Sequence, residues 1–351
     1  MKIYMRKSFL YYLLSLIYKA VVGFRHRLYN SGLKKIVKFD IPIICIGNIT
    51  VGGTGKTPMT EFVVSNFAKK YNTAVLSRGY GRRTKGYLEV EPTSHYRDVG
   101  DEPLQIKLKF PSSLVVVCED RVFAVNYIKE HHPEINLIIM DDGFQHRSIE
   151  PLVNIITLDA TRPVHEDKML PYGNLRDTIS SLDRAHYFVV TKCPDNMPPI
   201  EKRLWRKRLV HYAYQKIFFT QYVSYQPEPL FPNDVKESLE SKQSVIAVSG
   251  IGNTASFLSS VQTYYTLVDH IDFDDHHVYN VKDVARICEM MKKHEGAAVV
   301  ITEKDAVKLR VPNKLPLELR RKLYYIPMHI DFVDEPAINF LNNLEKDVRK
   351  N

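Results

Sequence analysis

Short apolar runs separated by longer mixed segments set the pattern of this chain. The runs are rich in Val, Ile and Leu and are bounded by polar or glycine residues, and the early ones lie at 41–46, 73–76, 114–117, 136–140, 153–158 and 185–190. Such runs are typical of strands buried on both faces of a parallel sheet. Between the first two, Phe62, Val63 and Phe67 recur at helical spacing. The pattern predicts an α/β fold with a mostly parallel sheet flanked by helices.

A change in composition divides the chain into two predicted domains. The strand-like run 216–225 leads into Gln226-Pro227-Glu228-Pro229, where prolines and charge suggest a domain junction. Beyond it, the apolar run 244–248 enters a glycine turn and indicates another α/β layer. We therefore expect a core domain over residues 29–225 and a smaller C-terminal α/β domain over residues 226–351.

Residues 1–28 form a separate apolar segment. Phe9 to Tyr18 is apolar except for Ser15, but Lys19 interrupts the run, which is too short for the roughly 20 residues of a spanning helix. No small-x-small cleavage site follows it. Basic residues flank the run: Lys2, Arg6, Lys7, Arg25 and Arg27. We predict an amphipathic helix at a membrane interface, with the basic residues on anionic headgroups. A helix packed on the core domain is the alternative.

Composition narrows the class of partner without choosing one. The 351 residues are 44% hydrophobic and 25% charged, which is ordinary for a folded protein. With 49 basic and 40 acidic residues, the net charge of +9 suits a nucleotide, a phosphorylated substrate or an acidic lipid. No nucleic-acid-binding motif appears. The four cysteines are far apart and form no C-x-x-C pair, so the sequence argues against a zinc site or a redox pair. Their spacing fits a protein of a reducing, cytosolic compartment.

The segment 41–57, IPIICIGNITVGGTGKT, is a predicted phosphate-binding loop between a strand and a helix. Glycines allow the tight turn and let backbone N–H groups point at phosphate oxygens. Lys56 can reach the β- and γ-phosphates, and the Thr57 hydroxyl can ligate Mg²⁺. Thr50 stands where the general pattern has glycine. The predicted nucleotide-binding residues are Thr50, Val51, Gly52, Gly53, Thr54, Gly55, Lys56 and Thr57.

Two pairs of adjacent acidic residues are candidate functional groups. Asp141 and Asp142 come directly after the run 136–140, the arrangement in which an aspartate holds Mg²⁺ beside a phosphate loop. Asp101 and Glu102 stand at a predicted helix start, where they either cap the helix or supply a catalytic carboxylate. Spacing by itself leaves these two alternatives open.

Basic and histidine residues add further candidate chemistry. Arg78, Arg82 and Arg83 lie in a loop after a strand, where open α/β sheets place ligands, and can hold a phosphate or carboxylate. A flexible basic loop is the alternative. The pair His276-His277 beside carboxylates could tune proton transfer or form a structural turn. Thr191-Lys192 follows another strand as in the guanine-reading loop of GTPases, but Pro194 replaces the required Asp, so ATP is the expected nucleotide.

Together these segments resemble the tetraacyldisaccharide 4′-kinases, the lipid A 4′-kinases of Gram-negative bacteria. The matching segments occur in the family's order: GNITVGGTGKTP (47–58), SRGYGRR (77–83), GDEP (100–103), DDGFQHR (141–147), LPYGNLRD (170–177), GIGN (250–253), DDHHVY (274–279) and TEKDAVKL (302–309). The occurrence of DDGFQHR and GGTGKTP in one chain is far more specific for this family than either motif alone. The phosphate loop of this family likewise departs from the general glycine pattern at the position of Thr50.

The resemblance implies transfer of the γ-phosphoryl group of ATP, with Mg²⁺, to the 4′-hydroxyl of a tetraacyldisaccharide 1-phosphate, giving lipid IVA for lipid A. The acceptor is an anionic lipid disaccharide in the cytoplasmic leaflet of the inner membrane. The protein is therefore expected on that membrane surface as a peripheral or monotopic enzyme, with the segment 1–28 at the interface and without a nucleic-acid partner.

The family motifs also imply roles for single residues. Lys56 would be catalytic, and Asp101 would accept the hydroxyl proton with His276 as its partner; which of His276 and His277 acts stays open. The second domain would thereby contribute to the active-site cleft and close around ATP. Asp177 stands where the family commonly shows Glu, so the acid is kept but shortened. The candidates for substrate or transition-state charge are Arg78, Arg121, His146 and Arg176.

Three other classes of protein stay open beside this interpretation. A P-loop ATPase or GTPase switch would hydrolyse nucleotide independently of lipid, although Pro194 counts against the GTPase form. A soluble metabolite kinase would act without lipid or detergent. A lipid-binding protein without activity would leave the phosphate loop and the aspartate pair unexplained.

Overall fold

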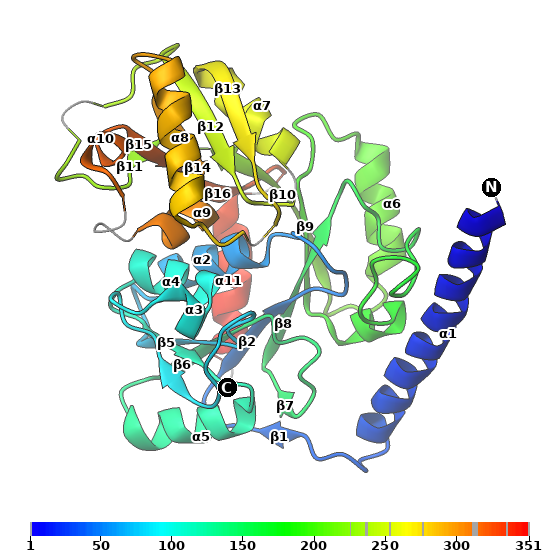
Figure 1. Ribbon diagram of the computed structural model, residues 1–351. Helices are drawn as coiled ribbons and strands as arrows, with labels where there is room; N and C mark the ends of the chain where they lie inside the picture. Colours follow the sequence, from blue (N-terminus) through cyan, green and yellow to red (C-terminus); the bar gives the residue numbers. More distant parts are fainter. Residues whose placement is uncertain are drawn as a thin grey trace. The chain divides into compact units, whose positions relative to one another are not determined.

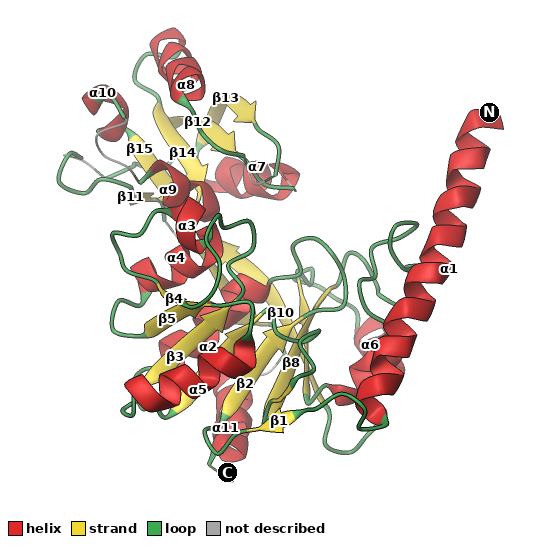
Figure 2. Ribbon diagram, turned by 60° about the horizontal axis from the view of Figure 1, so that its bottom comes forward, coloured by secondary structure: helices red, strands yellow, loops and turns green. Residues whose placement is uncertain are grey.

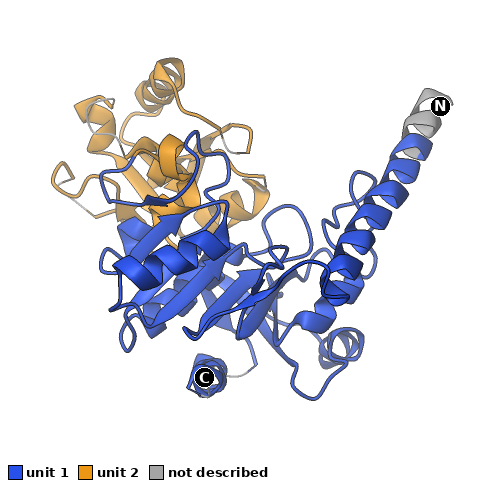
Figure 3. Ribbon diagram, turned by 90° about the horizontal axis from the view of Figure 1, so that it is seen from below, with its two compact units in different colours: residues 1–94, 106–222, 330–351 blue, residues 95–105, 223–329 orange. Residues whose placement is uncertain are grey.

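The computed structural model describes residues 2–349, apart from 225, 236–237, 253, 276, 311–314 and 335; side chains are described from residue 9 onward, except that of Ser224. The chain forms two compact units, coloured separately in Figure 3. Unit 1 contains residues 1–94, 106–222 and 330–351, and unit 2 contains residues 95–105 and 223–329. Each unit is described by itself.

Among the described residues, unit 1 is organised around a sheet of nine strands in the order β16-β10-β9-β8-β2-β6-β3-β5-β4. The strands are β2 (Ile43–Gly47), β3 (Thr73–Ser77), β4 (Leu88–Glu89), β5 (Leu114–Val117), β6 (Leu137–Asp141), β8 (Val153–Asp159), β9 (Tyr187–Thr191), β10 (Lys216–Ser224) and β16 (Met328–Phe332). A two-stranded parallel sheet of β1 (Val37–Lys38) and β7 (Ile149–Glu150) lies apart from it. The central strands pair in parallel, and every residue of β2, β6, β8 and β9 is buried. The apolar runs of the sequence are thus the core strands.

Helices flank this sheet, as Figures 1 and 2 show. They are α2 (Lys56–Phe67), α5 (Arg121–His131), α6 (Pro199–Leu209) and α11 (Ala337–Val348), with a 3-10 helix at Ile179–Arg184; α1 (Lys2–Asn30) projects at the side of the unit (Figures 1 and 2). The register of β2 against β6 determines which loops are adjacent, because Ile46 of β2 pairs with Asp141 of β6. The carboxyl ends of adjacent parallel strands meet at one edge, so the loops that follow β2 and β6 are neighbours.

Helix α1 exposes a long row of apolar side chains. Phe9, Ile17, Val21 and Phe24 are each more than 60% exposed, and Leu10, Leu13, Leu14 and Leu16 are also exposed. Its contacts with the rest of unit 1 include the ring of Tyr12, which meets the ring of Tyr172 edge to face at 5.6 Å. Within the part of the chain that the structure describes, no helix has the length and hydropathy needed to cross a membrane.

Unit 2 contains a five-stranded sheet, counted over its described residues, in the order β11-β15-β14-β12-β13. Its strands are β11 (Glu228–Pro229), β12 (Ser244–Ser249), β13 (Thr266–Asp272), β14 (Ala298–Thr302) and β15 (Leu323–Ile326). Its helices are α3 (Tyr96–Val99), α7 (Thr254–Tyr264), α8 (Val281–Lys293), α9 (Glu303–Leu309) and α10 (Leu317–Arg320), while α4 (Asp101–Lys109) runs across the unit boundary. Ile246 belongs to the apolar cluster that includes α8 and α9, and Ala247 belongs to the one that includes α7, so both faces of the sheet are covered.

The predicted domain limits and the compact units differ most in two segments, besides the inclusion of residues 1–28 in unit 1 and a boundary that falls after residue 222 and not after residue 225. Residues 330–351, predicted in the second domain, belong to unit 1, and residues 95–105, predicted in the first, belong to unit 2. The C-terminal segment joins unit 1 because the apolar face of α11 is buried there. Phe340 is fully buried and meets the ring of Phe218 edge to face at 5.2 Å. Contacts between residues this distant in the chain leave no local signal in the sequence.

Candidate functional site

The phosphate loop connects the buried end of β2 to the start of α2. Gly52 and Gly55 have φ of 90° and 89°, a conformation that is strained for other residues. Helix α2 begins at Lys56 without a side-chain cap on its first N–H groups. An uncapped helix start after a glycine-rich loop presents backbone donors and the positive end of the helix dipole to an anion.

Thr50 is accommodated because its position does not require a glycine. It forms an isolated antiparallel bridge with Leu175, and the next amide, of Val51, donates to the Asn174 carbonyl at 2.8 Å. A β-branched residue adopts this extended backbone readily. Inside the loop, Asn48 Nδ2 donates to Thr54 Oγ1 at 2.6 Å. The departure from the general glycine pattern therefore has a local cause, which is the pairing of this segment with the LPYGNLRD loop.

Side chains from β9 and β10 close over the end of the phosphate loop. Thr191 Oγ1 donates to the Thr54 carbonyl at 2.9 Å. A Cβ atom built on Gly55 would lie only 2.4 Å from Tyr222 Oη. Burial raises the pKa of Tyr222, so its hydroxyl stays protonated. Tyr222 was missed by the sequence analysis, because it lies in the middle of a strand-like run with no motif around it.

Asp141 and Asp142 lie beside the phosphate loop, at the end of β6. Lys56 Nζ is 3.7 Å from Asp142 Oδ1, and Arg176 Nη1 donates to Asp142 Oδ2 at 3.1 Å. Burial acts to raise the pKa of Asp142, but Lys56 and Arg176 outweigh it and hold the pKa below its ordinary value. Asp141 is buried and accepts a hydrogen bond from Thr60 Oγ1 at 2.9 Å. The structure thus brings Lys56, Arg176 and both aspartates together.

These groups fit a magnesium ion. The ionised Asp142 carboxylate and the Thr57 hydroxyl are hard oxygen ligands on adjoining elements, and the second carboxylate lies beside them on β6. Mg²⁺ is commonly held by one or two carboxylates, with water and phosphate oxygens completing the shell. No cluster of three His, Cys, Asp or Glu side chains suited to a metal occurs among the described residues. The two carboxylates and the hydroxyl would leave coordination positions to water and to nucleotide phosphates.

Arg121, which is 4% exposed, has Arg78 and His146 as neighbours. Burial lowers its pKa and the charge of Arg78 lowers it further. Burial followed by the charge of Arg121 lowers the pKa of His146 to about 4, and His146 Nε2 lies 2.7 Å from Ser148 Oγ. Arg121 Nε is buried and makes no hydrogen bond to any described residue. The three predicted residues form one cluster with a donor available for an anion.

The remaining candidates lie in unit 2. Asp101 is the first residue of α4, follows Gly100 with φ of 96°, and accepts a hydrogen bond from the Glu102 amide at 3.0 Å. His276 lies outside the described residues. Its neighbour His277 is 2.9 Å from Asp283 Oδ2 through Nε2 and stacks on Phe273.

The GIGN and TEKDAVKL segments meet at Asp305, which is fully buried. Asp305 Oδ2 accepts hydrogen bonds from the Gly250 amide at 2.9 Å and from Thr302 Oγ1 at 2.6 Å. Lys308 Nζ lies 3.5 Å from Asp305 Oδ1. A Cβ atom on Gly250 would lie 3.0 Å from Asp305 Oδ1 and 3.2 Å from His277 Cβ, so the GIGN turn packs closely against both the TEKDAVKL and the DDHHVY segments.

With this geometry in place, comparison with known proteins decides the family. The family model described as tetraacyldisaccharide-1-P 4′-kinase matches residues 7–346. The chain belongs to this family. Tetraacyldisaccharide 4′-kinases of Phocaeicola vulgatus and Bacteroides thetaiotaomicron are 37% and 36% identical to it over 347 and 355 residues, covering 97% of this chain in both cases and 95% and 93% of those proteins.

A solved structure supports the same assignment. The crystal structure of LpxK from Aquifex aeolicus in complex with ATP matches with a TM-score of 0.75 and 25% identity, covering 98% of this chain and 99% of that one. The predicted α/β fold of the P-loop type and the predicted family resemblance are thereby confirmed. The roles assigned to single residues stay predictions.

Proposed function

We propose that this member of the tetraacyldisaccharide-1-P 4′-kinase family transfers the γ-phosphoryl group of ATP to the 4′-hydroxyl of a tetraacyldisaccharide 1-phosphate, giving lipid IVA in lipid A biosynthesis. The observation that carries the proposal is the phosphate loop with Lys56 and Arg176 on the ionised Asp142, in a chain that belongs to this family. The similar crystal structure of LpxK from Aquifex aeolicus in complex with ATP supports ATP as the nucleotide.

At the nucleotide end, the backbone N–H groups of residues 50–57 cradle the phosphates and Lys56 balances the charge of the β- and γ-phosphates. Thr57 and one aspartate of the pair Asp141-Asp142 hold Mg²⁺. When bound, Mg²⁺ neutralises charge on the phosphate oxygens. Arg176 keeps Asp142 ionised and directed at the loop, as its contacts in the structure indicate.

At the acceptor end, Asp101 takes the proton of the 4′-hydroxyl as the oxygen attacks the γ-phosphorus and the bond to ADP breaks. A positioned base of this kind typically contributes about 10²–10⁴-fold to the rate. His276 of the C-terminal domain is the partner of Asp101 in this proposal. As the family motifs imply, the proposal includes closure of the second domain around ATP.

The two guanidinium groups of Arg78 and Arg121, with the neutral imidazole of His146 beside Arg121, are the proposed site for negative charge on the substrate. Arg121 offers a buried donor, and two guanidinium groups repel each other unless an anion lies between them. The 1-phosphate of the disaccharide and the transferring phosphoryl group are the two anions of this reaction. We assign the cluster to one of these charges.

The exposed apolar row of α1 supports a location at the cytoplasmic face of the inner membrane. Side chains such as Phe9, Ile17 and Phe24 are more than 60% exposed, and burying a side chain of this size contributes about 1.5–3 kcal/mol. Arg25 and Arg27 lie on the same helix and suit anionic headgroups. In this proposal the helix brings the kinase to an acceptor held in the leaflet.

One experiment separates this function from the other classes. The full chain is incubated with γ-labelled ATP, Mg²⁺ and disaccharide 1-phosphate lipid in mixed micelles, and the lipid fraction is extracted. The proposal requires label in the lipid, and the label must disappear with Lys56→Ala. Label released only as inorganic phosphate, at the same rate without lipid, indicates an ATPase and refutes the proposal.

A further inference from the structure

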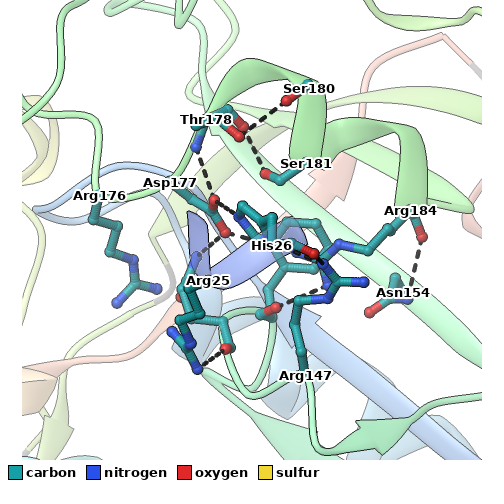
Figure 4. A network of polar contacts seen from close by, with 12 residues as sticks. Arg25, His26, Arg147, Asn154, Arg176, Asp177, Thr178, Ser180, Ser181 and Arg184 are labelled. Carbon is teal, nitrogen blue, oxygen red and sulfur yellow. Dashed lines mark hydrogen bonds and ion pairs between the residues drawn. The ribbon is translucent and has the colours of Figure 1, made fainter. Parts of the chain in front are cut away.

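Helix α1 is bonded to the loop that pairs with the phosphate loop. Tyr18 Oη donates to the Arg176 carbonyl at 3.1 Å, and His26 Nε2 lies 2.6 Å from Asp177 Oδ1. Figure 4 shows His26 between Asp177 and Arg147, with the helix beside the loop. Two side chains of α1, two turns apart, therefore hold two consecutive residues of the LPYGNLRD segment.

The proton on His26 can be assigned from its neighbours. Arg147 Nη1 lies 3.0 Å from His26 Nδ1, and a guanidinium group can only donate. Nδ1 is therefore the acceptor, and the ring proton is on Nε2, directed at Asp177. Asp177 is 1% exposed; burial acts to raise its pKa, but the hydrogen bond from His26 and the charge of Arg184 outweigh it and hold the pKa below its ordinary value. A buried carboxylate thus depends on a donor from α1.

The same two residues contact the phosphate loop directly. The Arg176 and Asp177 amides both donate to the Ile49 carbonyl, at 2.8 Å and 3.3 Å. The Arg176 guanidinium contacts Asn48 Oδ1 and both oxygens of Asp142. The side chain that sets the position and charge of Asp142 is therefore carried by the residue next to the partner of His26.

We propose that His26 and Asp177 form a positioning pair that couples α1 to the nucleotide site. The pair holds the 176–177 backbone against Ile49, so that Arg176 stays on Asp142 and the phosphate loop keeps its shape for MgATP. His26 is a positioning residue and acts through Asp177. The inference rests on the proposed function only in that the phosphate loop binds MgATP. Its consequence is that the helix assigned to the membrane also determines how well the enzyme binds its nucleotide.

The test measures the MgATP dissociation constant of the full chain in detergent micelles, without acceptor lipid, for His26→Ala, Asp177→Ala and the double variant. The expected loss of affinity is about 2- to 30-fold for each, the range through which residues outside a site modulate it. The double variant is expected to bind no more weakly than the weaker single one, because the two residues act as a unit. His26→Gln is expected to restore much of the affinity, since an amide carries both the acceptor for Arg147 and the donor for Asp177.

Lys19→Ala is the matched control, because Lys19 is exposed on the same helix and is expected to leave MgATP affinity unchanged. Equal affinity of His26→Ala and the unmodified chain, or losses that add in the double variant, would overturn the pair. If His26→Ala does not fold, as judged by circular dichroism, the affinity of Asp177→Ala relative to His26→Gln decides the question. The readout is independent of the acceptor: changed MgATP affinity without label in lipid would retain the pair and refute the proposed function, and label in lipid with unchanged affinity would do the reverse.

Discussion

Gly55 provides the sharpest test of the phosphate-loop geometry. The residue has φ of 89°, and a Cβ atom there would meet Tyr222 Oη at 2.4 Å and Thr191 Cγ2 at 3.1 Å. A left-handed conformation costs an alanine about 1–2 kcal/mol, and overpacking a buried position costs about 1–3 kcal/mol. Gly55→Ala is therefore expected to destabilise unit 1 by roughly 2–5 kcal/mol.

The assay is thermal unfolding of the nucleotide-free protein, in which no phosphate occupies the loop. At about 2–4 °C per kcal/mol for a unit of this size, the expected fall in Tm is roughly 5–15 °C. Gly53→Ala is the matched control, since a Cβ atom there has no neighbour within 4 Å among the described residues and the φ of Gly53 is not positive. Gly55→Ala combined with Tyr222→Phe removes the shortest contact and should recover part of the loss.

The backbone strain at Gly55 remains in that double variant, so full recovery is not expected. If Gly55→Ala melts at the same temperature as Gly53→Ala, the positive φ and the closure by Tyr222 are both refuted.

Three further predictions follow from the site and the helix. Asp101→Ala should lower kcat by about 10²–10⁴-fold with MgATP affinity retained, and a collapse of that affinity would instead make Asp101 a structural residue or a metal ligand. The pKa of His146 is lowered to about 4 in the folded protein, chiefly by burial. Its contribution to stability is therefore present above pH 6.5 and is lost as pH falls from 6.5 towards 4, by up to about 3 kcal/mol. Urea unfolding across this range should show that slope, and His146→Gln should flatten it; an equal slope in both proteins would contradict the assignment. Phe9→Asp with Ile17→Asp should lower binding to anionic phospholipid vesicles by about 10²–10⁴-fold, because two apolar contacts of about 1.5–3 kcal/mol each are lost. Unchanged sedimentation with vesicles would show that α1 does not enter the interface.

Much of this protein could be read from the sequence, where the signals are local. The run Ile43–Gly47 followed by glycines and Gly-Lys-Thr predicted the phosphate loop, because a buried strand, a turn with positive φ and a helix start each require particular residues within a few positions. Asp141 and Asp142 were placed beside it because parallel strands share one functional edge, and β2 and β6 are indeed paired.

Contacts between residues that are distant in the chain became visible only in the tertiary structure. In the structure, α11 packs in unit 1 through Phe340, and Tyr222 lies against Gly55. His26 contacts Asp177, which is 151 positions away in the chain. Asp177 illustrates the limit: the sequence showed only a shortened acid in a family motif, and its buried partner on α1 appeared once the chain was folded. Periodicity and motif spacing report the backbone that a segment prefers. Which side chains then meet depends on how the elements pack, because a buried charge or a crowded glycine is satisfied by whichever distant residue the fold brings to it.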